Sequence, residues 1–287
     1  MESPVKDSPV RPGFHRMEIQ KTTWDVPHRY ANLQAIGSGA YGTVCSAIDQ
    51  KTKEKVAIKK LYRPFQSLIH ATRAYRELRL LRQIQHENVI CLLNVFTPDP
   101  TLEKFQTFYM VMPFVAQDLG HIMKTKRLSN RIVTYLFYQL LRGLKYIHSA
   151  GIIHRVGIDQ LKKILRLTGT PDSSLVQKMQ SKDAQSYVRG LPPQKKKNFK
   201  EAFPGLDDNV IDLLEGMLLL DPEARLTAKQ GLSHPYVAEY HDPDCEPDSE
   251  PYDDSFESLE LAIGEWKSLI HMEIMTFDPD HPSMTAM

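Results

Sequence analysis

The sequence has few cysteines, almost no net charge and no long apolar run. Its 287 residues include three cysteines, Cys45, Cys91 and Cys245, which are odd in number and far apart. Neither a disulfide framework nor a zinc site follows from this spacing, and a reducing compartment is the simplest environment. Lysine and arginine number 36 against 35 acidic residues, so charge favours neither a nucleic-acid nor a membrane partner. No apolar run approaches the length of a membrane-spanning helix, and no internal repeat is visible.

The first residues also lack the apolar core of a signal peptide. Residues 1–13 are polar and contain prolines, so we expect a disordered leader. The remaining chain is long enough to bury a large core and to form two lobes. Trp24 and Tyr30 follow the leader, and we interpret them as packing aromatics that anchor the entry segment.

What the sequence does contain is a glycine-rich stretch, Gly37-Ser38-Gly39-Ala40-Tyr41-Gly42-Thr43-Val44. Three glycines in six positions let the backbone turn tightly and approach a charged ligand without obstruction by a Cβ atom. Apolar and polar residues alternate on both sides, which predicts two strands joined by this loop. A Rossmann turn is disfavoured because it needs a helix directly after the last glycine. Taken alone, the pattern fits an ordinary hairpin equally well.

A second pattern, Val56-Ala57-Ile58-Lys59, follows on the next predicted strand. A lysine on a buried strand is costly unless it has an anionic partner. The candidate partner is Glu77, on a predicted helix that includes residues 74–81 and that Ser67 could cap. Loop, lysine and helix glutamate together resemble the ATP-holding half of a protein kinase.

Two more strands are predicted at Val89–Leu93 and Phe108–Met112, giving a five-stranded antiparallel sheet plus one helix. The last strand should end at Pro113, because proline cannot donate a hydrogen bond to the ladder. A helix over Arg131–Ala150 is predicted from its wide apolar face, and Gly151 terminates it. The apolar face comprises Val133, Leu136, Phe137, Leu140, Leu141, Leu144 and Ile147.

These segments resemble the stress-activated mitogen-activated protein kinases, in particular a gamma-like subgroup. The matching phrases are residues 36–42, Lys59-Lys60-Leu61-Tyr62-Arg63-Pro64-Phe65-Gln66-Ser67, His86-Glu87-Asn88-Val89-Ile90 and residues 143–151. The resemblance runs from residue 13 to 155 and resumes from 159 to 277. It implies an α+β protein-kinase-like two-lobe fold, with a five-stranded antiparallel N-lobe and a helical C-lobe that is incomplete. It also implies proline-directed Ser/Thr kinase activity in stress signalling, with ATP and magnesium, in the cytoplasm and nucleus.

The resemblance assigns nucleotide-binding roles to the loop and to the linker between the lobes. Lys59 and Glu77 would be the retained catalytic residues. In the linker, the Pro113 C=O and Val115 N–H would read adenine, and Met112 would limit the depth of the pocket. Asp118 could accept from a ribose hydroxyl or cap a helix, and the two roles are compatible. The full set of cofactor-binding residues is Ile36, Gly37, Ser38, Gly39, Ala40, Tyr41, Gly42, Thr43, Val44, Ala57, Lys59, Met112, Pro113, Val115 and Asp118.

The catalytic loop of a kinase, H-R-D-L-x-x-x-N, is interrupted in this chain. Its Asp acts as base and its Asn holds magnesium, but here His154-Arg155 is followed by Val156-Gly157-Ile158-Asp159. No D-F-G, A-P-E or T-x-Y activation segment follows. We interpret this as one contiguous deletion after Arg155 and expect severely impaired phosphoryl transfer, with weak and largely magnesium-independent ATP binding. Asp159 as a substitute base is disfavoured, because nothing around it resembles a catalytic loop.

The deletion should also weaken the packing of the second lobe. We expect the apolar face of the Arg131–Ala150 helix to become exposed. Arg225, which pairs with the glutamate of A-P-E in the family, would lose its partner at a cost of roughly 3–5 kcal/mol if buried. We therefore expect an ordered first lobe and a compromised second lobe. The expected order is a leader (1–13), an N-lobe (14–112), a hinge (113–116), the start of the C-lobe (117–155), late C-lobe helices (156–240), and an acidic stretch with a C-terminal extension (241–287).

The acidic stretch matches acids that bind basic docking motifs in the family. Asp242, Asp244 and Glu246 fit that use, whereas Cys245 stands where a further acid is expected, and a solvated tail is the alternative interpretation. The implied partners are upstream MAP kinase kinases, substrates and phosphatases; neither nucleic acid nor a membrane is implied. Residues 265–277 resemble the extension that wraps back to the first lobe. Two alternatives to an impaired kinase stay open: a non-catalytic docking competitor, or an unstable splice or gene-model product.

Overall fold

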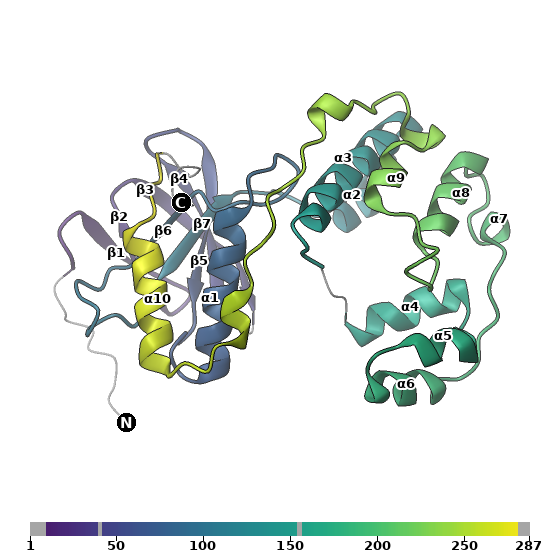
Figure 1. The fold of residues 1–287 in the computed structure, drawn as a ribbon. Helices are drawn as coiled ribbons and strands as arrows, with labels where there is room; N and C mark the ends of the chain where they lie inside the picture. Colours follow the sequence, from purple (N-terminus) through teal and green to yellow (C-terminus); the bar gives the residue numbers. More distant parts are fainter. Residues whose placement is uncertain (1–9, 40–41, 154–156, 281–287) are drawn as a thin grey trace. The chain divides into compact units, whose positions relative to one another are not determined.

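The computed structural model describes residues 10–39, 42–153 and 157–280, which fall into two compact units (Figure 1). Met1–Lys126 and Tyr252–Met287 form the first, here called the sheet unit, and Arg127–Pro251 form the second, the helical unit. The C-terminal extension therefore belongs with the first lobe, as its sequence predicted. Across the described part of the chain, no helix combines the length and apolarity needed to cross a bilayer.

The sheet unit is built on the predicted five-stranded antiparallel sheet, in the order β3-β4-β5-β7-β6. Its strands are β3 (Tyr30–Gly39), β4 (Gly42–Asp49), β5 (Lys55–Leu61), β6 (Asn94–Phe96) and β7 (Tyr109–Pro113). β7 ends at Pro113, where the missing N–H predicted an end. The strand expected over Val89–Leu93 is wrong: β6 begins only at Asn94, and of the expected strand only the Leu93 N–H donates to β7, to the Val111 carbonyl at 2.8 Å. The Leu92 N–H instead donates to the Leu81 carbonyl at 3.1 Å, so this apolar run packs against the preceding helix.

A two-stranded hairpin that was not predicted precedes the sheet. Its strands are β1 (Phe14–Ile19) and β2 (Thr22–Pro27). Trp24 and Val26 are fully buried in a cluster that includes Ile58 and Val111. The fold also begins earlier than the expected end of the leader at residue 13, because the Arg11 guanidinium donates to the Thr97 carbonyl at 2.9 Å.

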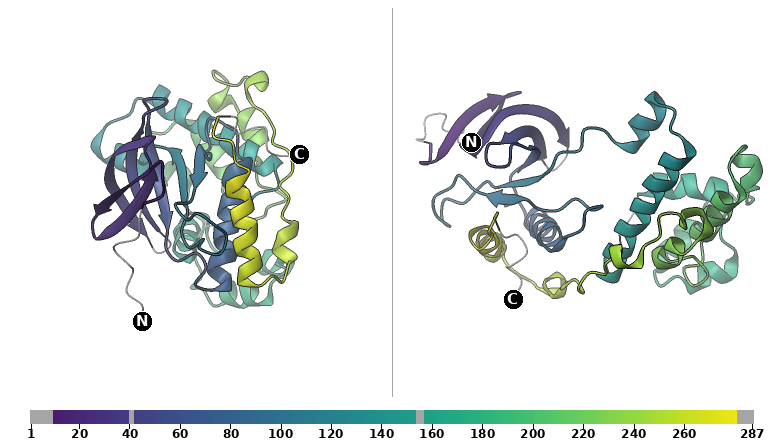
Figure 2. Two further views of the ribbon diagram at one scale, coloured as in Figure 1. Left: turned by 90° about the vertical axis from the view of Figure 1, so that its left-hand side faces the viewer. Right: turned by 90° about the horizontal axis from the view of Figure 1, so that it is seen from above.

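Two helices that are far apart in the sequence, α1 (Leu68–Gln83) and α10 (Ile263–Met275), lie side by side against the sheet (Figures 1 and 2). Ser67 caps α1 as predicted, and its hydroxyl accepts from the His70 N–H. The core between the helices contains Leu78 and Ile270, neither of which is exposed. The extension thus contributes directly to the core of the lobe. Two short elements, α2 (Leu119–Thr125) and the 3₁₀ helix η3 (Ser255–Ser258), complete the sheet unit.

The helical unit consists of short helices around one long one. Its elements are α3 (Asn130–Ser149), α4 (Ile158–Thr168), α5 (Ser173–Lys178), α6 (Lys182–Arg189), α7 (Phe199–Ala202), α8 (Asp208–Met217), α9 (Ala228–Leu232), and the 3₁₀ helices η1 (Pro235–Val237) and η2 (Pro243–Cys245). Its described core cluster is small, with five buried residues: Tyr138, Leu141, Leu213, Leu232 and Val237. α3 is the helix expected over Arg131–Ala150.

Two features of the helical unit bear on the expected effects of the deletion. On the apolar face of α3, Leu141 is buried, whereas Val133 and Leu140 are 40% and 51% exposed, in the direction expected. Arg225, however, does not incur the expected cost. Its side chain is exposed and donates to the Leu219 and Leu220 carbonyls at 2.6 and 3.0 Å. A guanidinium in water with backbone partners has no desolvation penalty to recover, so the expectation of a buried unpaired charge is wrong.

Candidate nucleotide-binding site

The glycine-rich stretch forms the turn end of the β3–β4 hairpin. Gly37 pairs with Val44, Ser38 with Thr43, and Gly39 with Gly42. A strand therefore follows the last glycine, as the alternating pattern predicted. Ile36, just before the first glycine, is 48% exposed. The two residues at the tip, Ala40 and Tyr41, lie outside the described residues.

Packing explains one of the three glycines of the turn and leaves the other two unexplained. A Cβ atom on Gly42 would meet the Lys60 carbonyl oxygen at 2.4 Å, so glycine is needed there for the close approach of β4 to β5. At Gly37 nothing lies within 4 Å of such a Cβ, and at Gly39 one atom lies at 4.0 Å. The packing of the protein does not require glycine at these two positions. The open space there is what a phosphate chain needs to approach the backbone.

The strand register brings four predicted site residues to one face of the sheet. Val44 on β4 lies opposite Lys59 on β5, and Ala57 on β5 lies opposite Met112 on β7. Paired residues, and residues two apart along a strand, point to the same side. Lys59 contacts α1, so this is the face that α1 covers. The opposite face packs on the β1–β2 hairpin through Ile58.

The predicted ion pair between Lys59 and Glu77 forms in the structure. The Lys59 Nζ lies 2.5 Å from the Glu77 Oε1 atom, and the two side chains are 21% and 35% exposed. Charges at this separation orient each other, and the partial burial limits the screening by solvent. The pair fixes the lysine on the covered face, near the strand that follows the glycine-rich turn.

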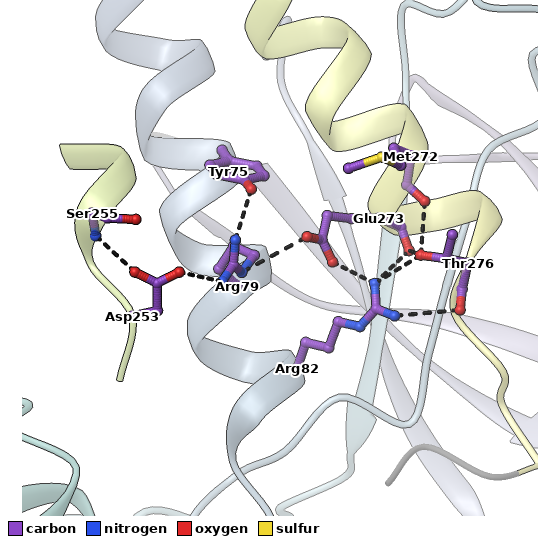
Figure 3. A network of polar contacts seen from close by, with 8 residues as sticks. All are labelled: Tyr75, Arg79, Arg82, Asp253, Ser255, Met272, Glu273 and Thr276. Atoms are coloured by element: carbon purple, nitrogen blue, oxygen red, sulfur yellow. Dashed lines mark hydrogen bonds and ion pairs between the residues drawn. The ribbon is translucent and has the colours of Figure 1, made fainter. Parts of the chain in front are cut away.

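α1, which carries Glu77, is held in place by the C-terminal extension (Figure 3). Arg82 pairs with Glu273 of α10, and both side chains are only 12% exposed. Arg82 also donates to the Thr276 hydroxyl at 3.1 Å. One turn earlier, Arg79 donates to the Tyr75 hydroxyl at 2.9 Å and lies 3.7 Å from Glu273. These contacts fix the rotation of α1, and with it the direction in which Glu77 points.

The segment after β7 carries the remaining predicted contacts. Val115 is 61% exposed, and its N–H has no hydrogen-bond partner among the described residues, so it is free to donate to a ligand. Pro113 pairs with Val56 at the end of the ladder. Asp118 caps α2, and its Oδ1 accepts from the His121 N–H at 2.8 Å. The second carboxylate oxygen of Asp118 has no hydrogen-bond partner within the described ranges, so the cap does not prevent contact with a hydroxyl group.

The residues around the catalytic-loop interruption divide into two groups. His154, Arg155 and Val156 lie outside the described residues. Asp159 lies in the first turn of α4 and is exposed. A carboxylate at this position interacts favourably with the helix dipole, which is a sufficient structural reason for it. No group of three or more His, Cys, Asp or Glu side chains in the described ranges is arranged to hold a metal ion.

The predicted docking acids do not form one surface cluster. Asp242 and Asp244 are exposed at η2, and Asp242 accepts from the Asp244 N–H at 3.1 Å. Hydrogen bonds from the Cys245 thiol and from this N–H lower the pKa of Asp242. Glu246 is instead buried, and its Oε1 lies 2.8 Å from the His241 Nδ1. Nothing in the sequence around Glu246 indicated that this acid points inward.

The acidic segment is fastened to α3 and is not a free tail. The Arg142 Nε donates to the Cys245 carbonyl at 2.9 Å, and the Lys145 ammonium donates to the Glu246 carbonyl. Lys145 also lies 3.7 Å from Asp248. The exposed carboxylates of η2 are therefore presented from a supported backbone.

Comparisons with known proteins agree with this geometry. A protein kinase domain family model matches residues 30–156. Mitogen-activated protein kinase 14 of Xenopus laevis is 43% identical over 343 residues, covering 93% of this chain and 95% of the relative. Mitogen-activated protein kinase 12 of Rattus norvegicus and of Homo sapiens are each 41% identical over 348 residues, covering 94% of this chain and 95% of each relative. These alignments are longer than the 287-residue chain, so they include positions at which this chain has no residue. The match to the family model ends at Val156, one residue past Arg155.

Proposed function

Because this chain belongs to the mitogen-activated protein kinase family of Ser/Thr kinases, we propose that it keeps the nucleotide-holding lobe of that family without transferring phosphate. In the family, ATP and magnesium supply the phosphoryl group and neutralise its charge. The chain's own contribution is to hold the nucleotide: the β3–β4 turn covers the phosphates, Lys59 orients them, and the Pro113–Val115 segment reads adenine.

One observation carries the proposal: the Lys59–Glu77 pair is formed at 2.5 Å, whereas the sequence after Arg155 contains no catalytic Asp or Asn. Phosphoryl transfer needs a base that orients the hydroxyl and metal ligands that neutralise developing charge. Each of these effects lowers the barrier by several kcal/mol, and a lysine on the nucleotide does not replace them. An internal deletion at the Arg155–Val156 junction accounts for both the retained and the missing parts.

A phosphoryl-transfer assay tests the proposal directly. The full chain is incubated with radiolabelled ATP, magnesium and a Ser-Pro peptide, in parallel with Lys59→Met. The expected result is that the two proteins give the same signal at the background level. Transfer by the wild-type chain that Lys59→Met abolishes would contradict the proposal, because it would require a working base elsewhere in the chain.

A second candidate function is a docking protein that competes with complete kinases for upstream kinases, substrates or phosphatases. It is favoured by the exposed carboxylates of Asp242 and Asp244, which sit on a backbone fastened to α3. Basic peptide motifs bind such surfaces mainly through charge complementarity. Glu246 is left out of this surface, because its carboxylate is buried against His241.

Binding of a basic docking peptide, measured by fluorescence anisotropy, separates this candidate from a merely solvated segment. Asp242→Ala combined with Asp244→Ala should weaken binding. Asp159→Ala combined with Glu260→Ala is the matched control, since it removes the same charge from exposed positions elsewhere. Equal weakening by both pairs, or no binding by the wild-type chain, would rule out a docking role.

A further inference from the structure

The helical unit contains an open depression of about 730 Å³ that plays no part in the nucleotide site. It lies between the C-terminal half of α4 and residues 196–203, which include α7. Four of the nine residues lining it are basic, namely Lys163, Arg166, Lys196 and Lys197, and one, Glu201, is acidic. Pockets of roughly 300–1,000 Å³ are the usual size for ligand binding. The volume of the depression and its excess of basic residues therefore both need a physical explanation.

The charge of the depression is mostly unneutralised. Lys196 lies 3.4 Å from Glu215, but no hydrogen bond or ion pair to another described residue involves the side chains of Lys163, Arg166 or Lys197. Helix-dipole attraction explains a cation at Arg166, which lies in the last turn of α4. It does not explain Lys163 or Lys197. Several cations around a concave surface focus a positive potential that attracts anionic groups.

The two sides of the depression are fixed to each other by the backbone. The Lys197 N–H donates to the Leu167 carbonyl at 2.9 Å, and the Thr170 N–H donates to the Gln194 carbonyl at 3.0 Å. Gly169, at φ +79°, allows this approach, since a Cβ there would lie 2.7 Å from the Lys196 backbone nitrogen. The lysines are therefore carried by a supported segment, and binding would cost little ordering of the chain.

The lining is not only basic. Leu167 and Phe203 are partly buried and contribute apolar surface, with Ala202 beside them. A free phosphate or a bare polyanion would leave this surface unused. A peptide whose acidic residues flank one apolar side chain would use both components, with its carboxylates on the lysines and its apolar group on Leu167 and Phe203. We propose that this depression binds an acidic peptide segment of a partner protein, and that this segment contains one apolar anchor residue.

The proposal can be tested on the full chain by fluorescence anisotropy with a labelled peptide that has glutamates on both sides of a single leucine. Lys163→Gln combined with Lys197→Gln removes two unpaired cations of the depression. Lys162→Gln combined with Lys195→Gln is the matched control, because it removes two lysines from the same two segments without touching the lining. Thermal melting followed by circular dichroism verifies that both variants fold like the wild type.

The variant of the depression should bind the peptide about fivefold more weakly than the wild type, as expected for two partly screened charge contacts, whereas the control should change binding by less than about twofold. Replacing the leucine of the peptide by serine should weaken binding further. Equal effects of both variants, or no binding, would overturn the proposal. Tighter binding of a single-stranded oligonucleotide than of the peptide would overturn it as well, because it would identify a different class of partner.

Discussion

The two units of this protein bury their apolar residues to very different degrees. In the sheet unit both faces of the sheet are covered, one by the β1–β2 hairpin and the other by α1 and α10. Among the described residues, nine of the twelve largest fully buried side chains belong to this unit, including Trp24, Trp266 and Tyr109. The described part of the helical unit has one small core cluster, and Val133 and Leu140 of α3 are exposed.

This difference indicates which part of the chain can fold without the missing residues. Stability is a small difference between large terms, so a unit with little buried apolar surface has little margin. The extension Tyr252–Met287 returns to the sheet unit and supplies Trp266 and Ile270 to its core. The described core residues of the sheet unit thus all come from the sheet unit itself.

The largest effect is expected for Trp266→Ala in the sheet unit. Trp266 is 2% exposed, and its ring lies 5.4 Å from the ring of Tyr75 on α1. Removing it leaves a cavity and should lower the free energy of unfolding by about 3–5 kcal/mol. Denaturant unfolding followed by the fluorescence of Trp24, the other tryptophan, measures this. A change below about 1 kcal/mol would mean that α10 is not part of the core of the lobe.

Leu141→Ala should remove most of the cooperativity of the helical unit. Leu141 is fully buried in the small cluster with Leu213 and Leu232. Truncating it should lower the free energy of unfolding by about 2–5 kcal/mol, which would exceed the stability of the helical unit. Hydrogen exchange should then show rapid exchange in α3 and α8 with unchanged protection of α1. Simultaneous loss of protection in both units would contradict the independent folding of the sheet unit. Leu140→Ala, at an exposed position of the same helix, serves as the control.

Several features of the sheet unit could be predicted from the sequence, because their motifs have fixed local geometry. The glycine-rich turn, Lys59 with Glu77, and the Ser67 cap formed as predicted, since each depends on residues close in sequence or on one specific charge pair. The β1–β2 hairpin escaped prediction because its turn residues, Gln20 and Lys21, have φ values of +50° and +62° without the Asn-Gly signal typical of such turns.

Other features depend on tertiary contacts that the sequence does not reveal. Leu92 sits in a strand-like apolar run, but its N–H bonds to α1. Arg225 was expected to lose its partner, and it lies in solvent with the carbonyls of its own loop as partners. The basic depression joins Lys163 to Lys197 across many intervening residues, so neither lysine segment alone suggested a site.

Gly169→Ala should have an intermediate effect within the helical unit. Gly169 has φ +79° and ψ 169°, a region that is almost exclusive to glycine and costs another residue about 1–3 kcal/mol, and the new Cβ would also meet the Lys196 nitrogen at 2.7 Å. Gly205→Ala is the matched control, because its φ is +86° but nothing lies within 4 Å of its Cβ. Denaturant unfolding should rank Gly169→Ala as more destabilising than Gly205→Ala. The reverse order would show that the close approach of the lysine segment to α4 is not maintained.

The smallest effect concerns the ion pair of Glu257 on η3 with Arg76 on α1. The hydrogen bond from Arg76 lowers the pKa of Glu257 below its ordinary value of 4.5. A depressed carboxyl pKa contributes stability above the ordinary value, and this contribution is lost as the pH falls through the folded pKa. Glu257→Gln should therefore lower stability by less than about 1 kcal/mol near neutral pH. Its difference from the wild type should shrink below pH 4.5, and a difference that persists there would exclude this ion pair as its cause.

The central claim is that this chain retains a nucleotide cradle and has lost the groups that act on the terminal phosphate. Calorimetric titration of ATP into the full chain, with and without Mg²⁺ and with Lys59→Met in parallel, tests it most directly. The account predicts weak binding that Mg²⁺ hardly changes and that Lys59→Met reduces. Tight binding that requires Mg²⁺ would contradict it, since it would demand metal ligands that the sequence does not contain.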